Sequence, residues 1–312
     1  MSILVINDPH TSDKPPRYRT ASYNDDIFDK MDQAVRIGHE NSVDFGVITG
    51  DLFHNPQAGK NSHLLVNRWM RFFYESELDW YILPGNHDLS AGRLASINKQ
   101  PIGVLANHPN VTLLEDGVVH NTINDGRIVG IGWNYAMDAE YIKQRVPDDI
   151  DVLFIHAAIW EQVQKYWYVI QMSELAGLAQ FIVYGHVHRG HEPVIVDNTW
   201  FVNAGAISRS THTKDLDTID LESDSRRIPK VTIIDGGSAT SYSLKARPAH
   251  EIFRYEVHEA QEAGSEAIQK FVESLEKAEV GSVTLEDLIS ELGKLTGESD
   301  IVELATQIMY SV

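Results

Sequence analysis

The chain contains no cysteine, few basic residues for its length and no long run of apolar residues. Without cysteine it forms no disulfide bond and offers no thiolate ligand to a metal. No apolar run approaches the roughly 20 residues that a membrane-spanning helix needs. The first strand-like run begins at Ile3, which leaves no room for a signal peptide. We therefore expect a cytoplasmic protein with no membrane partner.

Basic residues are outnumbered, with 26 Lys and Arg against 45 Asp and Glu and a net charge of −19. This balance argues against a protein that binds nucleic acid over most of its surface. The excess is uneven, because residues 251–312 hold 14 acidic and 4 basic residues, about half of the net charge. A local track of basic side chains beside the motifs described next is therefore still compatible with the composition.

The chain does contain a series of short apolar runs, each of which ends in polar residues. Runs of four or five apolar residues that close on Gly, Asp, Asn or His are typical of buried strands. In open α/β sheets, ligands gather outside the carboxyl ends of the strands, so we expect the polar clusters to converge on one place. The five clusters are Asp8-Pro9-His10, Gly50-Asp51, Gly85-Asn86-His87-Asp88, His156 and Gly185-His186-Val187-His188.

The donor atoms in these clusters indicate a metal site. Imidazole nitrogens combined with carboxylate and amide oxygens suit Mn²⁺, Fe²⁺ or Zn²⁺ and disfavour Mg²⁺ or Ca²⁺. Seven donors are too many for one tetrahedral ion, but they suit two ions if one carboxylate bridges them, and such a pair can hold a phosphoryl group. We expect two divalent ions, Mn²⁺ first with Fe²⁺ or Zn²⁺ as alternatives, on Asp8, His10, Asp51, Asn86, His156, His186 and His188.

The order of the clusters, D-x-H, G-D, G-N-H-D/E, a single H and G-H-x-H, resembles the calcineurin-like metallophosphoesterase family. The resemblance implies that Asp51 bridges two ions. It also implies the remaining ligands, which are Asp8, His10 and His188 for the first ion and Asn86, His156 and His186 for the second.

Three further residues are implied as catalytic. By the same resemblance His87 contacts the phosphate and protonates the leaving oxygen, and Asp88 orients His87. The segment Gly50–His54, with the sequence G-D-L-F-H, resembles the SbcD-type recombination nucleases, the partners of coiled-coil SbcC-type ATPases. This second resemblance implies that His54 helps to position the phosphate.

The spacing of apolar residues predicts the fold. Helical patterns over Asp25–Gly38 and Ser62–Ser76 alternate with strands in the first half, which predicts parallel strands with crossover helices. The fold class is therefore α/β, with two mixed β-sheets packed as a sandwich flanked by helices, as the family resemblance also implies. From Val111 onward turn pairs predict hairpins, at Glu115-Asp116-Gly117, Asn124-Asp125-Gly126, Asp197-Asn198 and Asp235-Gly236-Gly237.

We expect three parts along the chain: a nuclease core over residues 1–245, a reduced cap or linker over 246–280 and a C-terminal helical segment over 281–312. An apolar stripe from Leu285 to Leu295 suits either packing onto the core or binding a partner. Resemblance to short phage-encoded SbcD-like proteins implies that this segment binds the ATPase. It also implies a homodimer, formed through Ser62–Ser76.

The sequence leaves three functions open. The first is a Mn²⁺-dependent DNA nuclease, exo- or endonucleolytic, acting with an SbcC-type ATPase in recombination, repair or end processing. The alternative is a stand-alone phosphatase or cyclic-nucleotide phosphodiesterase, which the acidic charge and the short cap favour. A non-catalytic scaffold ranks last, because a scaffold need not keep every metal ligand.

Overall fold

The computed structural model describes residues 1–90, 93–161, 169–210, 214–215, 218–219 and 227–255. The chain divides into two compact units, Met1–Phe253 and Arg254–Val312, and both sheets belong to the first. The expected helical segment 281–312 and most of the expected cap or linker lie outside the described residues. Among the helices that the structure does describe, none has the length and apolar character to cross a membrane.

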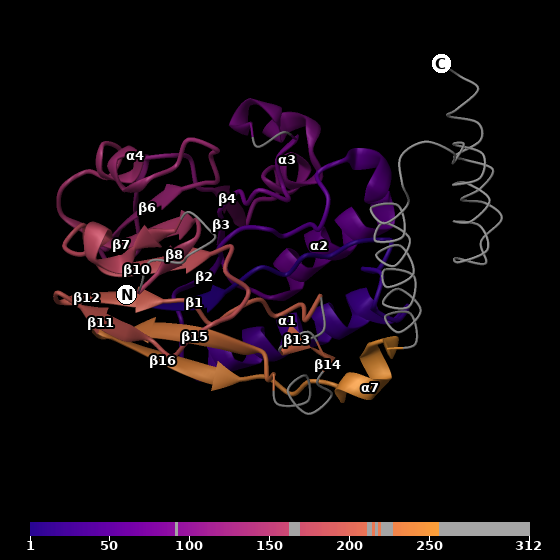
Figure 1. Ribbon diagram of the computed structural model, residues 1–312. Helices are drawn as coiled ribbons and strands as arrows, with labels where there is room; N and C mark the ends of the chain where they lie inside the picture. The colour runs from indigo at the N-terminus through magenta and orange to yellow at the C-terminus, as the bar shows by residue number, and fades with distance from the viewer. Residues whose placement is uncertain (91–92, 162–168, 211–213, 216–217, 220–226, 256–312) are drawn as a thin grey trace, which may run out of the picture. The chain divides into compact units, whose positions relative to one another are not determined.

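The first sheet has six strands in the order β16-β15-β1-β2-β3-β4 (Figure 1). Strands β1 to β4 are parallel, and β15 runs antiparallel between β1 and β16. Helices α1 (Tyr23–Glu40) and α2 (His63–Glu75) connect the first three strands, as the sequence predicts. The strands are β1 (Ser2–Ile6), β2 (Phe45–Ile48), β3 (Trp80–Ile82), β4 (Val111–Leu113), β15 (Lys230–Asp235) and β16 (Ser238–Ser243).

The second sheet also has six strands, in the order β11-β12-β10-β7-β6-β5. Its four central strands are parallel and its two edge strands antiparallel. The prediction of two mixed sheets is therefore confirmed. The strands are β5 (Val119–Asn121), β6 (Arg127–Ile131), β7 (Ile150–His156), β10 (Ala179–Gly185), β11 (Val194–Val196) and β12 (Thr199–Val202).

Shorter elements complete the described part of the chain. Two two-stranded sheets pair β8 with β9 and β13 with β14. Their bounds are β8 (Ile159–Trp160), β9 (Ile170–Gln171), β13 (Lys214–Asp215) and β14 (Thr218–Ile219). The short helices are η1 (Ala58–Lys60), η3 (Leu94–Lys99), α3 (Pro101–Leu105), α4 (Ala139–Lys143), α5 (Met172–Leu175) and α7 (Ala249–Ile252).

Three apolar layers hold the sandwich together. In β1, Ile3 and Val5 pack with side chains of the second sheet, whereas Leu4 and Ile6 pack with α1 and α2. Both faces of the strand are buried, which explains why its sequence is apolar throughout rather than alternating. A third layer covers the far side of the second sheet with residues of α4 and α5. Because the faces of both sheets are covered by apolar residues, polar side chains are found at the ends of the strands.

Three of the four predicted hairpins are confirmed, and one is wrong. The turns at Asn124-Asp125-Gly126, Asp197-Asn198 and Asp235-Gly236-Gly237 join antiparallel neighbours. Residues 115–117 instead carry the chain from β4 in the first sheet to β5 in the second. Gly117 has the positive φ of a turn, +72°, and its N–H donates to the Gly130 carbonyl of β6. A turn sequence fixes local geometry, but it does not decide whether the next strand pairs with the previous one.

Helix α1 carries a polar cluster on its buried side. The Asp26 carboxylate accepts hydrogen bonds from Lys30 Nζ at 2.7 Å and from Arg19 Nη2 at 2.8 Å. All three side chains are buried, and Arg19 also donates to the carbonyls of Ser208 and Arg209. The cluster therefore ties α1 to the chain segment that follows β12.

Candidate metal centre

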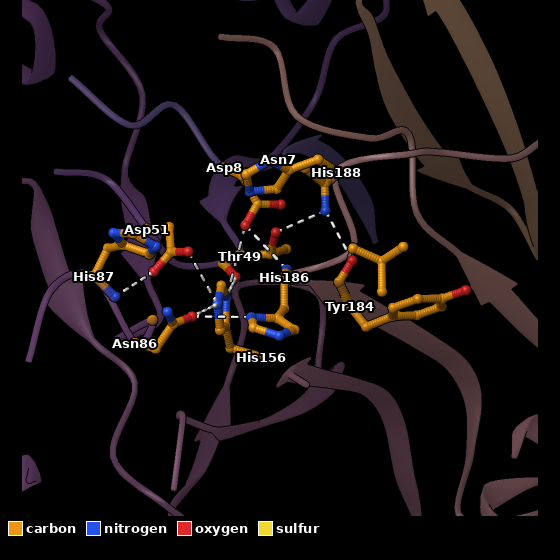
Figure 2. A network of polar contacts seen from close by, with 12 residues as sticks. Asn7, Asp8, Thr49, Asp51, Asn86, His87, His156, Tyr184, His186 and His188 are labelled. Atoms are coloured by element: carbon orange, nitrogen blue, oxygen red, sulfur yellow. Dashed lines mark hydrogen bonds and ion pairs between the residues drawn. The ribbon is translucent and has the colours of Figure 1, made fainter. Parts of the chain in front are cut away.

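All five polar clusters lie together at the carboxyl ends of parallel strands (Figure 2). The first three follow β1, β2 and β3 of the first sheet, whereas the last two follow β7 and β10 of the second. His156 is the last residue of β7, and His186 comes directly after β10. The centre therefore draws its residues from both sheets, at the edge where their strands end.

The first group of potential metal ligands consists of Asp8, His10, Asp51 and His188, whose ligand atoms lie within 4.8 Å of one another. The Nε2 atoms of His10 and His188 are 2.8 Å apart, and His10 Nε2 is 3.5 Å from Asp51 Oδ2. Imidazole nitrogens that face each other and a carboxylate at this range form the kind of site that a divalent ion occupies.

The second group shares Asp51 with the first and adds His156 and His186. His156 Nε2 lies 3.4 Å from Asp51 Oδ2 and 3.1 Å from Asn86 Oδ1. The same amide oxygen is 2.9 Å from His186 Nδ1. Asn86 therefore joins this group through its oxygen, and Asp51 lies where the two groups meet.

In each of the two buried carboxylates, only one oxygen has a hydrogen-bond partner. Asp8 Oδ1 accepts from the backbone N–H of His186 at 3.0 Å, and Asp51 Oδ1 accepts from that of His87 at 2.8 Å. The other oxygens, Asp8 Oδ2 and Asp51 Oδ2, are buried without a hydrogen-bond partner. Because a buried anionic oxygen without a partner is costly, this pattern fits oxygens that bind cations. The donor set therefore fits two divalent ions.

The backbone at this centre is unusual as well. Asp8, His10, Asp51 and His186 have positive φ angles of 46°, 51°, 50° and 83°. Such angles are uncommon for residues with a Cβ and cost of order 1 kcal/mol or more each. They turn the chain sharply after each strand, so that neighbouring side chains reach one centre. Strain gathered at one place is typical of functional sites.

Close approach of the chain segments requires glycine at two positions. Gly50 has a φ of +103°, and a Cβ there would collide with the His156 ring. A Cβ at Gly85 would collide with the Asp51 carboxylate. The turns before Asp51 and Asn86 therefore need glycine for space, and Gly50 needs it for backbone conformation as well.

Burial keeps three of the four histidines among the expected ligands neutral. It lowers the pKa of His186 and of His188 to about 4 and the pKa of His10 well below its usual value. A histidine binds metal only in its neutral form, so these rings are ready to bind at neutral pH. Burial also raises the pKa of Asp8 to about 7, with the nearby Asp51 charge adding to the effect.

His156 and Asp51 form a coupled pair. Burial alone would lower the pKa of His156, but the Asp51 carboxylate outweighs it and raises the pKa to about 9. In Asp51 the charges of His156 and His10 likewise outweigh burial and hold the pKa far below its usual value. His156 Nδ1 donates to the Thr49 carbonyl at 2.7 Å, which turns Nε2 toward Asp51. A cation beside Asp51 would compete with the proton on Nε2.

His54 and His87 lie beside the first group. Their rings stack with centroids 5.2 Å apart and an interplanar angle of 20°, and both rings also meet that of His10. The Nδ1–H of His87 donates to the His54 carbonyl at 2.8 Å. His54 Nδ1 is buried without a hydrogen-bond partner, and burial lowers its pKa. The structure thus gathers both residues at the centre.

Asp88 has a different role from the one the sequence analysis expected. The ring of His87 is oriented by the His54 carbonyl rather than by Asp88. Asp88 instead accepts backbone N–H groups of Leu52, Phe53 and Gly85, at 3.3, 3.0 and 3.0 Å. Its carboxylate therefore joins the loops that follow β2 and β3. Burial raises its pKa to about 7, and the Asp51 charge contributes to this increase.

Two residues beside the centre were missed from sequence. The Trp133 ring stacks on that of His186, with centroids 4.7 Å apart and an interplanar angle of 28°. It follows the apolar end of β6, so the same strand-end pattern that located the ligands also marks it. The Asn7 side chain donates to Thr49 Oγ1 at 2.7 Å and to the Tyr184 carbonyl at 2.8 Å, which links both sheets. Its position directly before Asp8 was the available signal.

Comparison with known proteins agrees with this geometry. The family model of the calcineurin-like phosphoesterases matches residues 1–190. The crystal structure of TT1561 of Thermus thermophilus is similar in fold, with a TM-score of 0.51, 12% sequence identity, and coverage of 78% of this chain and 99% of that chain. A second solved structure has a TM-score of 0.50, 14% identity and the same coverage, 78% and 99%.

A search of the curated proteins finds no match. The solved structures, at such low identity, bear on the fold alone. The family model spans more than half of the chain, and all ten residues implied from sequence as ligands or catalytic groups fall within its range. The chain therefore belongs to the calcineurin-like phosphoesterase family, whose members are metal-dependent hydrolases of phosphoesters.

Proposed function

We propose that this protein is a Mn²⁺-dependent DNA nuclease that acts with an SbcC-type ATPase in recombination, repair or end processing. The observation that carries the proposal is the place of His54. This residue distinguishes the SbcD-like segment Gly50–His54 from a generic Gly-Asp pair, and its ring lies against His87 and His10 rather than in solvent. A residue implied to position the phosphate thus lies beside the candidate metal centre.

The ions are assigned by the two groups of ligands. We assign Asp8, His10, Asp51 and His188 to one ion, and Asn86, His156, His186 and the bridging Asp51 to the other. Imidazole ligands favour Mn²⁺, Fe²⁺ or Zn²⁺ over Mg²⁺. When bound, two such ions supply Lewis acidity and an activated water to phosphoester hydrolysis.

The protein's own residues bind the phosphate and supply a proton. His87 Nδ1–H is held by the His54 carbonyl, which leaves Nε2 to carry the proton for the departing 3′-oxygen. The half-buried ring of His54 stacks on that of His87 and would help to position the phosphate. The centroids of the two stacked rings are 5.2 Å apart, which is close enough for both to contact one phosphate.

A second candidate is a stand-alone phosphatase or phosphodiesterase that acts on a small substrate. The net charge of −19 favours it, because a polyanionic substrate would be repelled by most of the surface. The two candidates share the metal centre and differ in the size of the substrate. They are therefore separated by substrates rather than by metal binding.

The test compares bis-p-nitrophenyl phosphate with single-stranded DNA in the presence of Mn²⁺, for the wild type and for His54→Ser. The nuclease proposal expects both substrates to be hydrolysed, and expects His54→Ser to lose activity while it keeps its metal. His63→Ser, an exposed histidine of α2, is the matched control. Fast hydrolysis of the small diester with no cleavage of DNA, even beside a matching ATPase, would leave the second candidate standing.

The ATPase partner is proposed to bind the C-terminal segment 281–312. Because the candidate centre lies wholly within residues 8–188, deletion of residues 284–312 is expected to spare hydrolysis of bis-p-nitrophenyl phosphate. The same deletion is expected to abolish pull-down of an SbcC-type ATPase. Unchanged pull-down would exclude this segment as the docking element.

A homodimer is proposed to form through α2. Leu64 in its first turn is 79% exposed, and Tyr74 in its last turn is 72% exposed. Exposed apolar residues at both ends of one helix suit a contact with a second copy. Sedimentation of Leu64→Glu is expected to show a monomer where the wild type shows a dimer; equal sedimentation of the two would exclude α2 as the interface.

A further inference from the structure

A basic pocket lies on the first unit outside the metal centre. Its volume is about 430 Å³, within the range of small-molecule sites rather than of single ions. Among the described residues that line it, four are basic and none is acidic, in a chain with a net charge of −19. The lining residues are Arg209, Arg227, Ile228, Leu244, Lys245, Ala246, Arg247 and Pro248.

The backbone of one pocket wall is held in place. The N–H of Leu244 donates to the Pro229 carbonyl at 2.8 Å. At Lys245 the N–H donates to Gln33 Oε1 at 2.8 Å, and the carbonyl accepts from Gln33 Nε2 at 3.0 Å. At Arg247 the carbonyl accepts from Arg209 Nη1 at 2.9 Å. The exposed side chains of Lys245 and Arg247 are thus presented by a fixed backbone, which lowers the entropic cost of binding an anion.

The pocket adjoins the metal centre through one chain segment. After β12, the N–H of Ala206 donates to the His188 carbonyl at 3.1 Å, and the N–H of Ile207 donates to the Asn7 carbonyl at 3.1 Å. Two residues later the same segment reaches Arg209, which is only 2% exposed and lines the pocket.

Positive charge beside a phosphoesterase centre matches a polyanion better than a small substrate. A small phosphodiester bound at the ions has no second phosphate for the pocket, whereas a polynucleotide carries one at every nucleotide. Arginine and lysine are the side chains that bind phosphate in most nucleic-acid complexes. The apolar side chains of Ile228, Leu244 and Pro248 add a surface for the sugar or base.

We propose that this pocket binds a backbone phosphate of the polynucleotide substrate, away from the bond that is cleaved. The inference rests on the proposed nuclease function and adds a second point of attachment for the DNA. It also answers how an acidic protein holds an acidic polymer, because the pocket gathers positive charge at one place on the surface.

The test uses the full chain with Mn²⁺, a fluorescent single-stranded oligonucleotide and the double variant Lys245→Glu/Arg247→Glu. The control is Arg36→Glu/Lys143→Glu, which makes the same change of charge at exposed residues of α1 and α4. Relative to the control, the pocket variant is expected to raise KM for the oligonucleotide at least tenfold with little change in kcat. The slope of log Kd against log salt concentration is expected to be smaller by about 1.4 in the pocket variant. Each phosphate contact contributes about 0.7 to this slope for a single strand, and the variant loses two contacts.

Hydrolysis of bis-p-nitrophenyl phosphate is expected to be equal in the wild type and both double variants, because a small diester does not reach the pocket. Equal KM and equal salt dependence in the two double variants, with DNA still cleaved, would overturn the inference and leave the nuclease proposal intact. Hydrolysis of the small diester with no binding or cleavage of DNA by the wild type would overturn both. The milder variant Lys245→Gln/Arg247→Gln is expected to raise KM for the oligonucleotide by a smaller factor. An unchanged melting temperature in this variant would show that binding is lost without loss of the fold.

Discussion

His87 and Asp88 are neighbours in the chain, yet their side chains have different partners. The His87 ring lies among the histidines of the centre, whereas the Asp88 carboxylate faces the backbone of the loops after β2 and β3. Removal of the first side chain takes away a proton donor. Removal of the second takes away the acceptor of three buried N–H groups. The two substitutions should therefore fail in different ways.

For His87→Ala we expect unchanged metal content and a loss of turnover by about two to four orders of magnitude, the usual scale for a general acid. The reason is that His87 reaches the centre without belonging to either group of potential ligands that contains Asp51. Metal content is measured by elemental analysis and turnover with bis-p-nitrophenyl phosphate. His63→Ala on the surface of α2 serves as control, and loss of metal in His87→Ala would contradict the assignment.

For Asp88→Ala we expect a loss of stability instead. Each buried N–H left without an acceptor costs about 1–3 kcal/mol, so the free energy of unfolding should fall by at least about 2 kcal/mol. Urea unfolding of the metal-free protein measures this free energy. The absence of metal ensures that a change in metal affinity does not contribute to the result. Asp148→Ala in an exposed bend is the comparison. A stability like that of the wild type would mean that the three hydrogen bonds contribute little.

At the scale of elements, helix α1 shows what periodicity predicts and what it does not. The spacing of Ile27, Met31, Ala34 and Val35 predicted the buried face; the first three are buried and Val35 is half-buried. Asp26 and Lys30 lie on the edge of the same face and are buried with Arg19. An acid and a base four residues apart are usually a solvated surface pair, so periodicity alone does not predict their burial. The deciding partner, Arg19, precedes the helix.

The buried Lys30 makes the free energy of unfolding depend on pH. Burial lowers the pKa of Lys30 to about 8, from 10.5, although Asp26 opposes the shift. Between these values the unfolded chain holds more protons than the folded one, so the free energy of unfolding rises with pH from about 8 toward 10. The slope has an upper limit of about 1.4 kcal/mol per pH unit for one proton. Above pH 10 the raised pKa of Tyr23 acts in the opposite direction.

We expect Lys30→Met to lack this rise, whereas Lys143→Met, at an exposed position of α4, keeps it. Urea unfolding at several pH values between 7.5 and 10 measures the difference. Asp26 keeps its hydrogen bond to Arg19 in the variant, so the cluster is not left as an unpaired anion. Parallel pH profiles for the wild type and Lys30→Met would show that Lys30 is not the group that titrates.

Gly50 lies in the turn between β2 and Asp51, and its substitution tests how closely the chain segments must approach at the centre. We expect Gly50→Ala to lose metal and activity, because its Cβ would displace the His156 ring at a φ of +103°. Gly59→Ala in η1 is the control, since a Cβ there meets nothing within 4 Å. Elemental analysis with Mn²⁺ present and hydrolysis of bis-p-nitrophenyl phosphate distinguish them. Normal metal content in Gly50→Ala would mean that the loop can shift at little cost.

At the scale of the whole molecule, the sequence predicted the architecture because the strands are short, uninterrupted apolar runs and the expected ligands follow them directly. Burial on both faces and the strand-end position of Asp8, Asp51, Asn86 and His156 were enough to predict convergence on one edge. The failures share one physical cause. The partner of Asp88, the pairing after Gly117 and the stacking of Trp133 all depend on which segments meet across the two sheets. Local pattern carries no information on such long-range contacts.

The metal centre also joins the two halves of the sandwich. Asp8, Asp51 and Asn86 follow strands of the first sheet, whereas His156 and His186 belong to the second. Ions held by both sets of residues would link the two sheets, so metal binding is expected to stabilise the molecule as a whole rather than one loop. The buried oxygens Asp8 Oδ2 and Asp51 Oδ2 have no hydrogen-bond partner within the protein, so cations that bind there would offset the cost of their burial.

We therefore expect Mn²⁺ to raise the melting temperature of the protein after treatment with EDTA, by the equivalent of about 2.7 kcal/mol for each site at a hundredfold excess over its Kd. Mg²⁺ at the same concentration should raise it less, because four of the seven expected ligands are imidazoles. Asp51→Asn keeps the shape of the side chain but removes the charge shared by both groups, so its melting temperature should respond little to Mn²⁺. His39→Asn, at an exposed position near the end of α1, should respond as the wild type does. A full Mn²⁺ response in Asp51→Asn would show that the ions do not meet at this carboxylate, and that the two groups of ligands act separately.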